Sequence, residues 1–204
     1  MVPALVALTF LFPGAARAQW KFAVIPYVAA YFPLRRLVDS AGFTEQQANA
    51  PLFGARLSYW IAREIAVEVG SGFTKSKIIT ETSGQISNGS VTNKQDGYLI
   101  FSSARLLYKP ARSNFFGFLG GSITMRRGDA WPKQGFPKRD TFGGVAGFGA
   151  RSEVTSSLSL WVSAEGHFYR ANFDGDGPTG RYYGPTTQTD LIVTIGVPIA
   201  LLNR

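Results

Sequence analysis

Apolar side chains alternate with small or polar side chains along much of this chain, most regularly near its C-terminus. In residues 188–201, every second position from 191 onward is aliphatic: Leu191, Val193, Ile195, Val197, Ile199 and Leu201. The intervening positions are mixed and include Asp190, Thr194 and Gly196. Because successive side chains of a strand point to opposite faces, this pattern predicts a β-strand with one continuous apolar face.

The same period of two predicts an all-β fold with eight strands. They span residues 20–32, 51–61, 64–75, 97–108, 114–125, 141–154, 158–173 and 188–201. The fifth strand is so rich in Gly and Phe that its faces cannot be assigned from the pattern. Residues 76–96 are polar, and residues 126–140 contain several Gly and Pro, so both segments are predicted to be loops.

The connections between these strands alternate in length. They are short after the second, fourth and sixth strands and long after the others. In an antiparallel meander, alternate connections lie at opposite ends, so one end carries tight turns and the other carries the long loops. Together with strands of at least about ten residues, this is typical of membrane barrels. We therefore predict an eight-stranded antiparallel up-and-down transmembrane β-barrel with short periplasmic turns and long extracellular loops.

A soluble lipocalin-like binding barrel shows the same alternation, so the chemistry of the two faces has to separate these classes. The polar face is mostly Gly, Ser and Ala, which suits a narrow lumen better than a wetted surface. The apolar face carries aromatic residues near strand ends, as expected of membrane-interface girdles. These are Tyr59, Phe73, Tyr98, Tyr108, Phe142 and Phe168. Both observations favour the membrane barrel.

The few charges on the polar face are predicted to form a lumenal network. They are Arg56, Glu68, Arg105, Arg151, Glu165 and Asp190, three of each sign. Ions are tolerated in an enclosed interior only when they are paired. His167, the only histidine, lies two residues after Glu165 on the same face and is predicted to be a hydrogen-bond partner of a lumenal carboxylate.

Composition limits the remaining possibilities. The 204 residues predict one domain, and the absence of Cys excludes disulfides and thiolate metal sites. Residues 1–18 resemble a secretory signal peptide, with an apolar run, a Pro13-Gly14 break and the small-x-small ending Ala16-Arg17-Ala18. Residues 19–204 form the predicted barrel domain and lack an apolar run approaching about 18 residues. The net charge of +8 is not clustered as in a nucleic-acid binder.

With these features, residues 19–201 resemble the small eight-stranded outer-membrane barrels of Gram-negative bacteria, the OmpA/OmpX-like group. Thr194, Gly196, Ile199 and Leu201 are similar to the signal by which the barrel-assembly machinery recognises a last strand. The resemblance implies an exported, integral, monomeric protein of the bacterial outer membrane. Its partners would be membrane lipid, lipopolysaccharide and the assembly machinery, with no nucleic acid and no cofactor.

Two segments suggest a chemical role, and each has a simpler structural interpretation. Lipid A deacylases of the barrel type have a His-x-Ser arrangement on an outward face, whereas His167-Phe168-Tyr169 lacks the serine and His167 is predicted to face inward. Residues 174–177 read Asp-Gly-Asp-Gly, as in part of a calcium loop, but no bidentate Glu follows, and such repeats are ordinary turn formers. We predict no catalytic, cofactor or metal site.

The segment after the fifth strand is the most basic of the long connections. Its basic residues are Arg126, Arg127, Lys133, Lys138 and Arg139. They are either solvated or in contact with lipopolysaccharide phosphates, because arginine binds phosphate in a bidentate manner. The expected function is a non-enzymatic envelope-structural or surface-interaction role. The alternatives are a narrow pore, a lipid A-modifying enzyme and a soluble lipocalin-like barrel.

Overall fold

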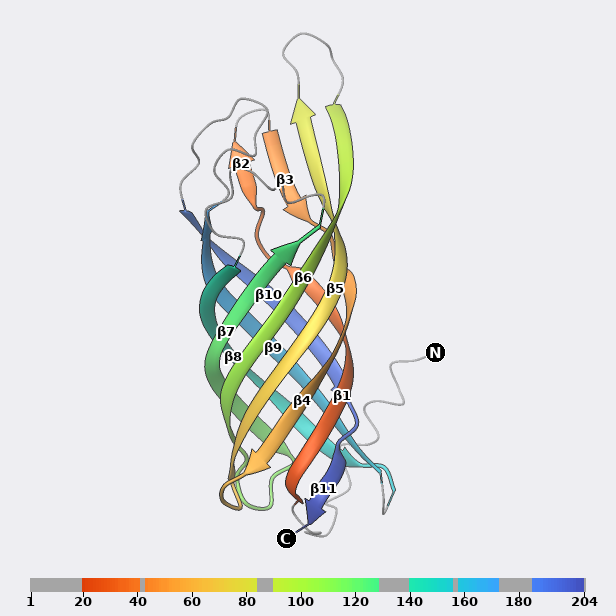
Figure 1. Cartoon of the computed structure of the whole chain (residues 1–204), viewed down its shortest axis with the longest axis vertical. Helices are drawn as coiled ribbons and strands as arrows, with labels where there is room; N and C mark the ends of the chain where they lie inside the picture. The colour runs from red at the N-terminus through yellow and green to blue at the C-terminus, as the bar shows by residue number, and fades with distance from the viewer. Residues whose placement is uncertain are drawn as a thin grey trace.

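The computed structural model describes residues 20–40, 43–83, 90–128, 140–155, 158–172 and 185–203, and all regular structure within them is β (Figure 1). No helix in these ranges is long and apolar enough to cross a membrane. The predicted signal peptide lies outside them. The strands that form the barrel wall are β1 (Trp20–Pro33), β4 (Ala50–Trp60), β5 (Ile65–Ser83), β6 (Ser90–Tyr108), β7 (Phe115–Arg127), β8 (Asp140–Glu153), β9 (Ser159–Asn172), β10 (Pro185–Gly196) and β11 (Ile199–Asn203), which continues β10.

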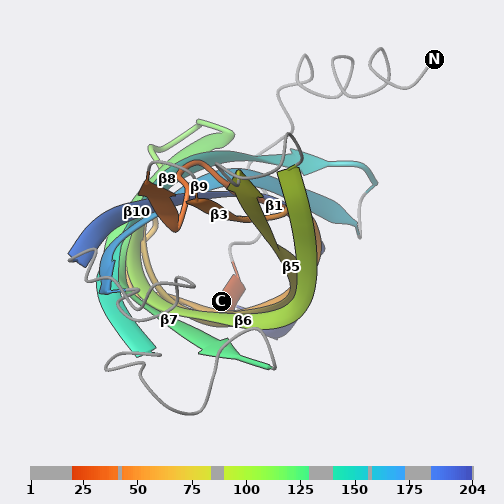
Figure 2. The same cartoon turned by 90° about the horizontal axis from the view of Figure 1, so that it is seen from above.

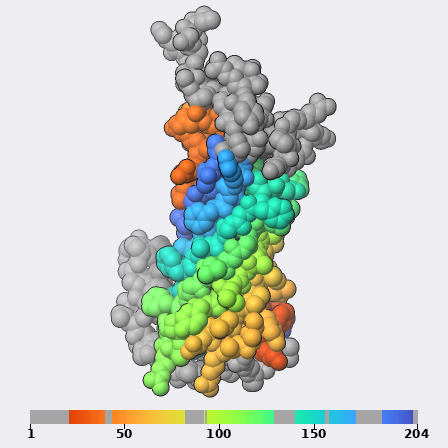
Figure 3. Space-filling view, turned by 90° about the vertical axis from the view of Figure 1, so that its left-hand side faces the viewer, coloured from red at the N-terminus to blue at the C-terminus, as the bar shows by residue number. Residues whose placement is uncertain are grey.

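Each strand of the wall pairs antiparallel with the next one along the chain, and the last pairs with the first. Tyr27 of β1 lies opposite Gly196 of β10, and Val24 lies opposite Ile199 of β11. Seen from above, the wall forms a closed ring (Figure 2), and its strands cross the outer surface as tilted bands of colour (Figure 3). The predicted eight-stranded up-and-down barrel is confirmed.

The final strand is interrupted where the sequence predicted a continuous one. β10 ends at Gly196 and β11 begins at Ile199, with Val197 and Pro198 between them. Proline has no N–H to donate to a ladder, so a break at Pro198 removes no hydrogen bond from the pairing. The amide of Val197 still donates to the Pro26 carbonyl at 3.1 Å, which keeps the two halves aligned on β1.

The largest difference from the sequence prediction is the β5–β6 hairpin. Residues 76–96 were predicted to form a loop, but paired positions continue from Ser76 opposite Gly97 to Ser83 opposite Ser90. A short hairpin of β2 (Val38–Ser40) and β3 (Phe43–Gln47) extends this sheet, because β3 pairs with β5. The loop prediction was wrong because most residues on both faces of these strands are polar, so the sequence shows no alternation, although their Thr and Ile residues favour strands.

The interior of the barrel contains two buried hydrophobic clusters. The cluster nearest the short turns consists of Ile25, Trp60, Ala66, Leu107, Phe116, Phe118, Val145 and Trp161. The other cluster, toward the opposite end, consists of Tyr27, Tyr31, Leu52, Leu99, Phe101 and Ile192. These side chains show that β7, whose faces the sequence left open, points Phe116 and Phe118 inward.

Candidate functional site: the charged lumen and the outer surface

A four-residue ion cluster crosses the middle of the lumen. Arg56 of β4 donates from Nη2 to both carboxylate oxygens of Glu165 on β9, each at 2.9 Å. Arg105 of β6 donates from Nη1 to Glu165 Oε2 at 2.6 Å and from Nε to Glu68 Oε2 at 2.7 Å. All four side chains are buried. Two arginines therefore neutralise two glutamates from four different strands.

Aromatic rings and hydroxyl groups support the two arginines. The Arg56 guanidinium lies 4.2 Å from the centre of the Tyr27 ring, and that of Arg105 lies 3.9 Å from the centre of the Phe118 ring. Arg56 Nη1 also donates to Thr194 Oγ1 at 3.4 Å. Guanidinium groups stack favourably on aromatic faces. These contacts hold the two guanidinium groups across the lumen and partly offset the unfavourable free energy of burying their charges.

His167 lies beside this cluster but is not arranged for catalysis. Its Nε2 is 3.6 Å from Glu165 Oε1, beyond hydrogen-bond distance, and its ring packs 5.1 Å from that of Phe101. The side chain is buried and points inward, but it does not form the predicted hydrogen bond with a lumenal carboxylate. An imidazole that acts on a membrane lipid has to reach the outer face, so this placement offers no lipid-modifying chemistry.

Two members of the predicted network lie apart from the cluster. Asp190 accepts hydrogen bonds from the hydroxyls of Tyr31 at 3.1 Å and Tyr169 at 2.6 Å. Arg151 lies near the short turns, where its Nη2 is 3.6 Å from Glu153 Oε1 and donates to Ser159 at 3.2 Å. The structure thus brings five of the seven predicted lumenal groups together, whereas Asp190 and Arg151 form separate contacts.

The structure excludes, for Arg126, both solvation and lipopolysaccharide contact, the two alternatives for the basic residues of its segment. Its side chain is 1 % exposed inside the barrel, donates to Thr141 Oγ1 at 3.3 Å and lies 5.0 Å from the centre of the Tyr169 ring. The sequence predicts a loop from residue 126, but β7 continues through Arg127, so strand alternation turns Arg126 inward. Arg127 points outward and pairs with Asp140 at 2.6 Å. Lys133, Lys138, Arg139 and residues 174–177 lie outside the described residues.

The predicted assembly residues occupy both faces of the last strand. Thr194 is buried and hydrogen-bonded with Ser163, whereas Ile199 and Leu201 are exposed on β11. Gly196 is the last residue of β10. The described part of the chain has no group of three or more His, Cys, Asp or Glu side chains that could hold a metal ion.

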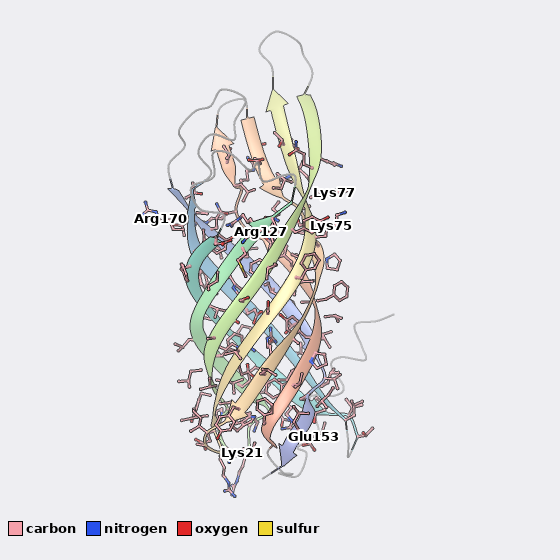
Figure 4. All side chains as sticks on the ribbon, viewed as in Figure 1. Lys21, Lys75, Lys77, Arg127, Glu153 and Arg170 are labelled. Atoms are coloured by element: carbon pink, nitrogen blue, oxygen red, sulfur yellow. The ribbon has the colours of Figure 1, made fainter. Side chains whose placement is uncertain are left out.

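The outer surface of the barrel is apolar. Large hydrophobic side chains project from every strand of the wall and form an apolar belt, which includes Val28, Phe53, Leu57, Val69, Phe73, Leu106, Leu119, Phe142, Phe148, Phe168 and Ile195. The outward positions of β5 from Ile65 to Phe73, of β6 from Ile100 to Tyr108 and of β7 from Phe115 to Met125 carry no Asp, Glu, Lys or Arg. Charged side chains reappear at the two ends of the belt, as labelled in Figure 4.

Comparisons with known proteins agree with this architecture. No protein-family model and no curated protein matches the chain. Among solved structures, the outer membrane protein OprG from Pseudomonas aeruginosa aligns with a TM-score of 0.58 and 16% identity, covering 89% of this chain and 96% of that one. Neisserial surface protein A aligns with a TM-score of 0.51 and 14% identity, covering 91% and 99%. The chain therefore has the fold of small outer-membrane β-barrels.

Proposed function

We propose that this protein is an integral, monomeric barrel of the Gram-negative outer membrane, of the OmpA/OmpX-like type. One observation carries the proposal: the barrel places its paired charges inside and an uncharged apolar belt outside. A soluble lipocalin-like barrel has the opposite arrangement, with a wetted polar exterior. An exposed apolar surface that surrounds the whole wall is suited to hydrocarbon and would aggregate in water.

Within the membrane, the role we propose is non-enzymatic and structural, or one of surface interaction at the loop end. The lumen supports this proposal because the ion cluster crosses its middle and Trp60, Phe116 and Trp161 pack together near the turns. An eight-stranded barrel has an interior that side chains can fill. The inward position of His167 argues against lipid modification, and the filled interior argues against a pore.

Membrane fractionation combined with gel mobility tests the proposal. The expressed chain should pellet with outer membranes, resist extraction by urea and migrate faster in unheated than in heated detergent samples. Heat-dependent mobility reports a barrel that stays closed in detergent. Recovery of the folded protein in the soluble fraction would contradict the membrane location and favour the lipocalin-like alternative.

A further inference from the structure

A buried indole N–H lies at the turn end of the lumen. Trp161 of β9 is 4 % exposed, and its Nε1 donor has no hydrogen-bond partner among the described residues. Nearly all buried donors in proteins are paired, because an unpaired donor loses its hydrogen bonds to water without replacement. The indole ring packs 4.9 Å from that of Phe116, which restricts its orientation. This end of the lumen therefore holds a fixed donor that lacks an acceptor.

Strand register places an arginine beside this donor. Arg151 of β8 lies directly opposite Trp161, and both occupy inward positions of their strands. Arg151 Nη2 donates to Ser159 Oγ at 3.2 Å and lies 3.6 Å from Glu153 Oε1. That ion contact is longer than those of the central cluster, which measure 2.6 and 2.9 Å. Because a guanidinium group has five N–H donors, Arg151 can keep its present contacts and still bind another oxygen acceptor.

A second cation, Lys109, follows β6 at the same end of the barrel. The turn that contains it is held against β8, since the Arg151 amide donates to the Asn114 carbonyl at 2.8 Å. The pKa of Lys109 is lowered, first by its partial burial and then by the nearby positive charge of Arg151. Glu153 and Glu64 oppose this shift without cancelling it, and Glu64 already accepts a hydrogen bond from a backbone amide of the same turn. A further negative charge near the two cations would therefore be favourable.

The aromatic side chains behind these donors limit how far a ligand can enter. Trp60, Phe116 and Trp161 belong to the buried cluster nearest the turns. The side chains of Arg151 and Glu153 are 13 % and 31 % exposed, and Figure 4 shows Glu153 at the turn end of the barrel. The guanidinium group is thus open to solvent from that end only in part. A ligand has to approach end-on and can present only its terminal group.

We propose that Arg151, Lys109 and the Trp161 indole bind a carboxylate that is presented to the lumen from the turn end. The guanidinium group can donate two parallel hydrogen bonds to a carboxylate, the indole supplies a further donor, and the lysine supplies charge. A single negative charge suits a site where Glu153 already balances part of the two positive charges. That such a ligand comes from the periplasm, as the C-terminus of an extended peptide, rests on the proposed outer-membrane location, whereas the site itself does not.

Nuclear magnetic resonance of the refolded full chain in detergent micelles tests this. The indole N–H of Trp161 gives a separate resonance, which the variant Trp161→Phe identifies by its loss. Titration with N-acetyl-alanine should shift this resonance downfield until it saturates, because the N–H gains an acceptor. Chloride at equal ionic strength, and N-acetyl-alanine amide, which lacks the carboxylate, should leave it in place. No shift with N-acetyl-alanine, equal shifts with chloride or the amide, or a stronger response to inorganic phosphate would overturn the proposal.

Substitutions locate the binding at these cations. Arg151→Gln should weaken the binding of N-acetyl-alanine at least about tenfold, and Lys109→Gln, in a half-buried turn position, about threefold. The matched control is Lys21→Gln, which removes the same charge from β1, three strands away from both β6 and β8 around the ring. The control should bind within about twofold of the unmodified chain.

Heat-dependent gel mobility shows which variants fold. If Arg151→Gln does not fold, Lys109→Gln and its control decide, and equal binding by these two variants would overturn the proposal. A closed barrel that ignores the carboxylate rejects only this inference, whereas a chain recovered as a soluble barrel rejects the proposed function.

Discussion

Glu165 connects two arginines that come from different strands of the barrel. If Glu165 lost its charge, Glu68 would be the one carboxylate left in the cluster to neutralise the buried Arg56 and Arg105. Breaking a buried ion pair by removing one partner leaves an uncompensated charge and is strongly destabilising. The interior of this barrel therefore depends on a small number of charged side chains, and their removal is a direct test of how they are arranged.

We predict that Glu165→Gln lowers the free energy of unfolding by about 3–5 kcal/mol. Urea unfolding in lipid vesicles, followed by tryptophan fluorescence, measures the change. Asp39→Asn is the control, because it breaks the exposed Arg36–Asp39 pair and should change stability by about 0–1 kcal/mol. Equal effects of the two substitutions would contradict a buried cluster.

Two neighbouring glycines of β7 face opposite sides of the wall. A Cβ added to Gly120 would lie 2.6 Å from Arg105 Cα and 2.8 Å from Arg105 Cβ, whereas one added to Gly121 would meet nothing within 4 Å. Gly120→Ala should therefore destabilise the barrel by about 1–3 kcal/mol through overpacking. Gly121→Ala should be neutral or slightly stabilising. The same unfolding assay measures both, and a larger loss for Gly121→Ala would be inconsistent with the assigned faces.

The β2–β3 hairpin packs beside the part of β5 that extends beyond the apolar belt. Leu37, just before β2, and Val38 of β2 are buried, and so is Ile78 of β5. Ala48 N donates to Lys77 O at 2.8 Å, and Gln188 Nε2 donates to Arg36 O at 3.2 Å. Glu45 of β3 lies opposite Val38 on one side and Thr80 on the other, so a half-buried carboxyl group lies within this small sheet.

The partial burial of Glu45 predicts a pH dependence for the hairpin. Burial raises the pKa of Glu45 from 4.5 to about 7, while a hydrogen bond with Thr80 opposes the rise. A carboxyl group with a raised pKa stabilises the packed form fully below pH 4.5, and this contribution is lost as the pH rises through about 7. The protection of the β3 amides against hydrogen exchange, measured relative to the intrinsic exchange rate at each pH, should therefore be greater at pH 6 than at pH 8. Glu45→Gln should remove this difference, and its persistence in the variant would rule out Glu45 as the cause.

How far the sequence predicts each element depends on the contrast between its two faces. Alternation located the wall strands because one face meets the lumen and the other is apolar, as at Arg56 and Leu57. It failed for the β5–β6 extension and for β2–β3, where most residues on both faces are polar and the few apolar ones, such as Val38 and Ile78, do not repeat regularly. It also failed for Arg126, because the small residues of β7 conceal its period. The sequence predicted lumenal charges, but the curvature of the closed wall decides that Glu165 meets Arg56 and Arg105 while Asp190 meets tyrosines.

The side chains that fill the interior of the barrel predict that the inserted protein does not conduct ions. The ion cluster lies across the lumen and the Trp60–Phe116–Trp161 group lies near the turns, so we expect ions to have no continuous aqueous path. Planar-bilayer recordings of the inserted protein should show no unitary conductance steps. Insertion is verified on the same preparation by protease protection in vesicles. Reproducible steps from verified insertions would contradict the proposed structural role and support the narrow pore.

The barrel closes through a single pairing that joins the two ends of the chain. All other wall pairings join consecutive wall strands, whereas β1 has to wait for β10 and β11. Contacts between residues far apart in the chain form slowly, because the entropy of loop closure opposes them. Until they form, β1 and the last strand each present an unpaired edge, which hydrocarbon does not tolerate. For the outer-membrane location proposed above, insertion and closure are therefore coupled steps, and entry into the bilayer is complete only when the final strand has paired with β1.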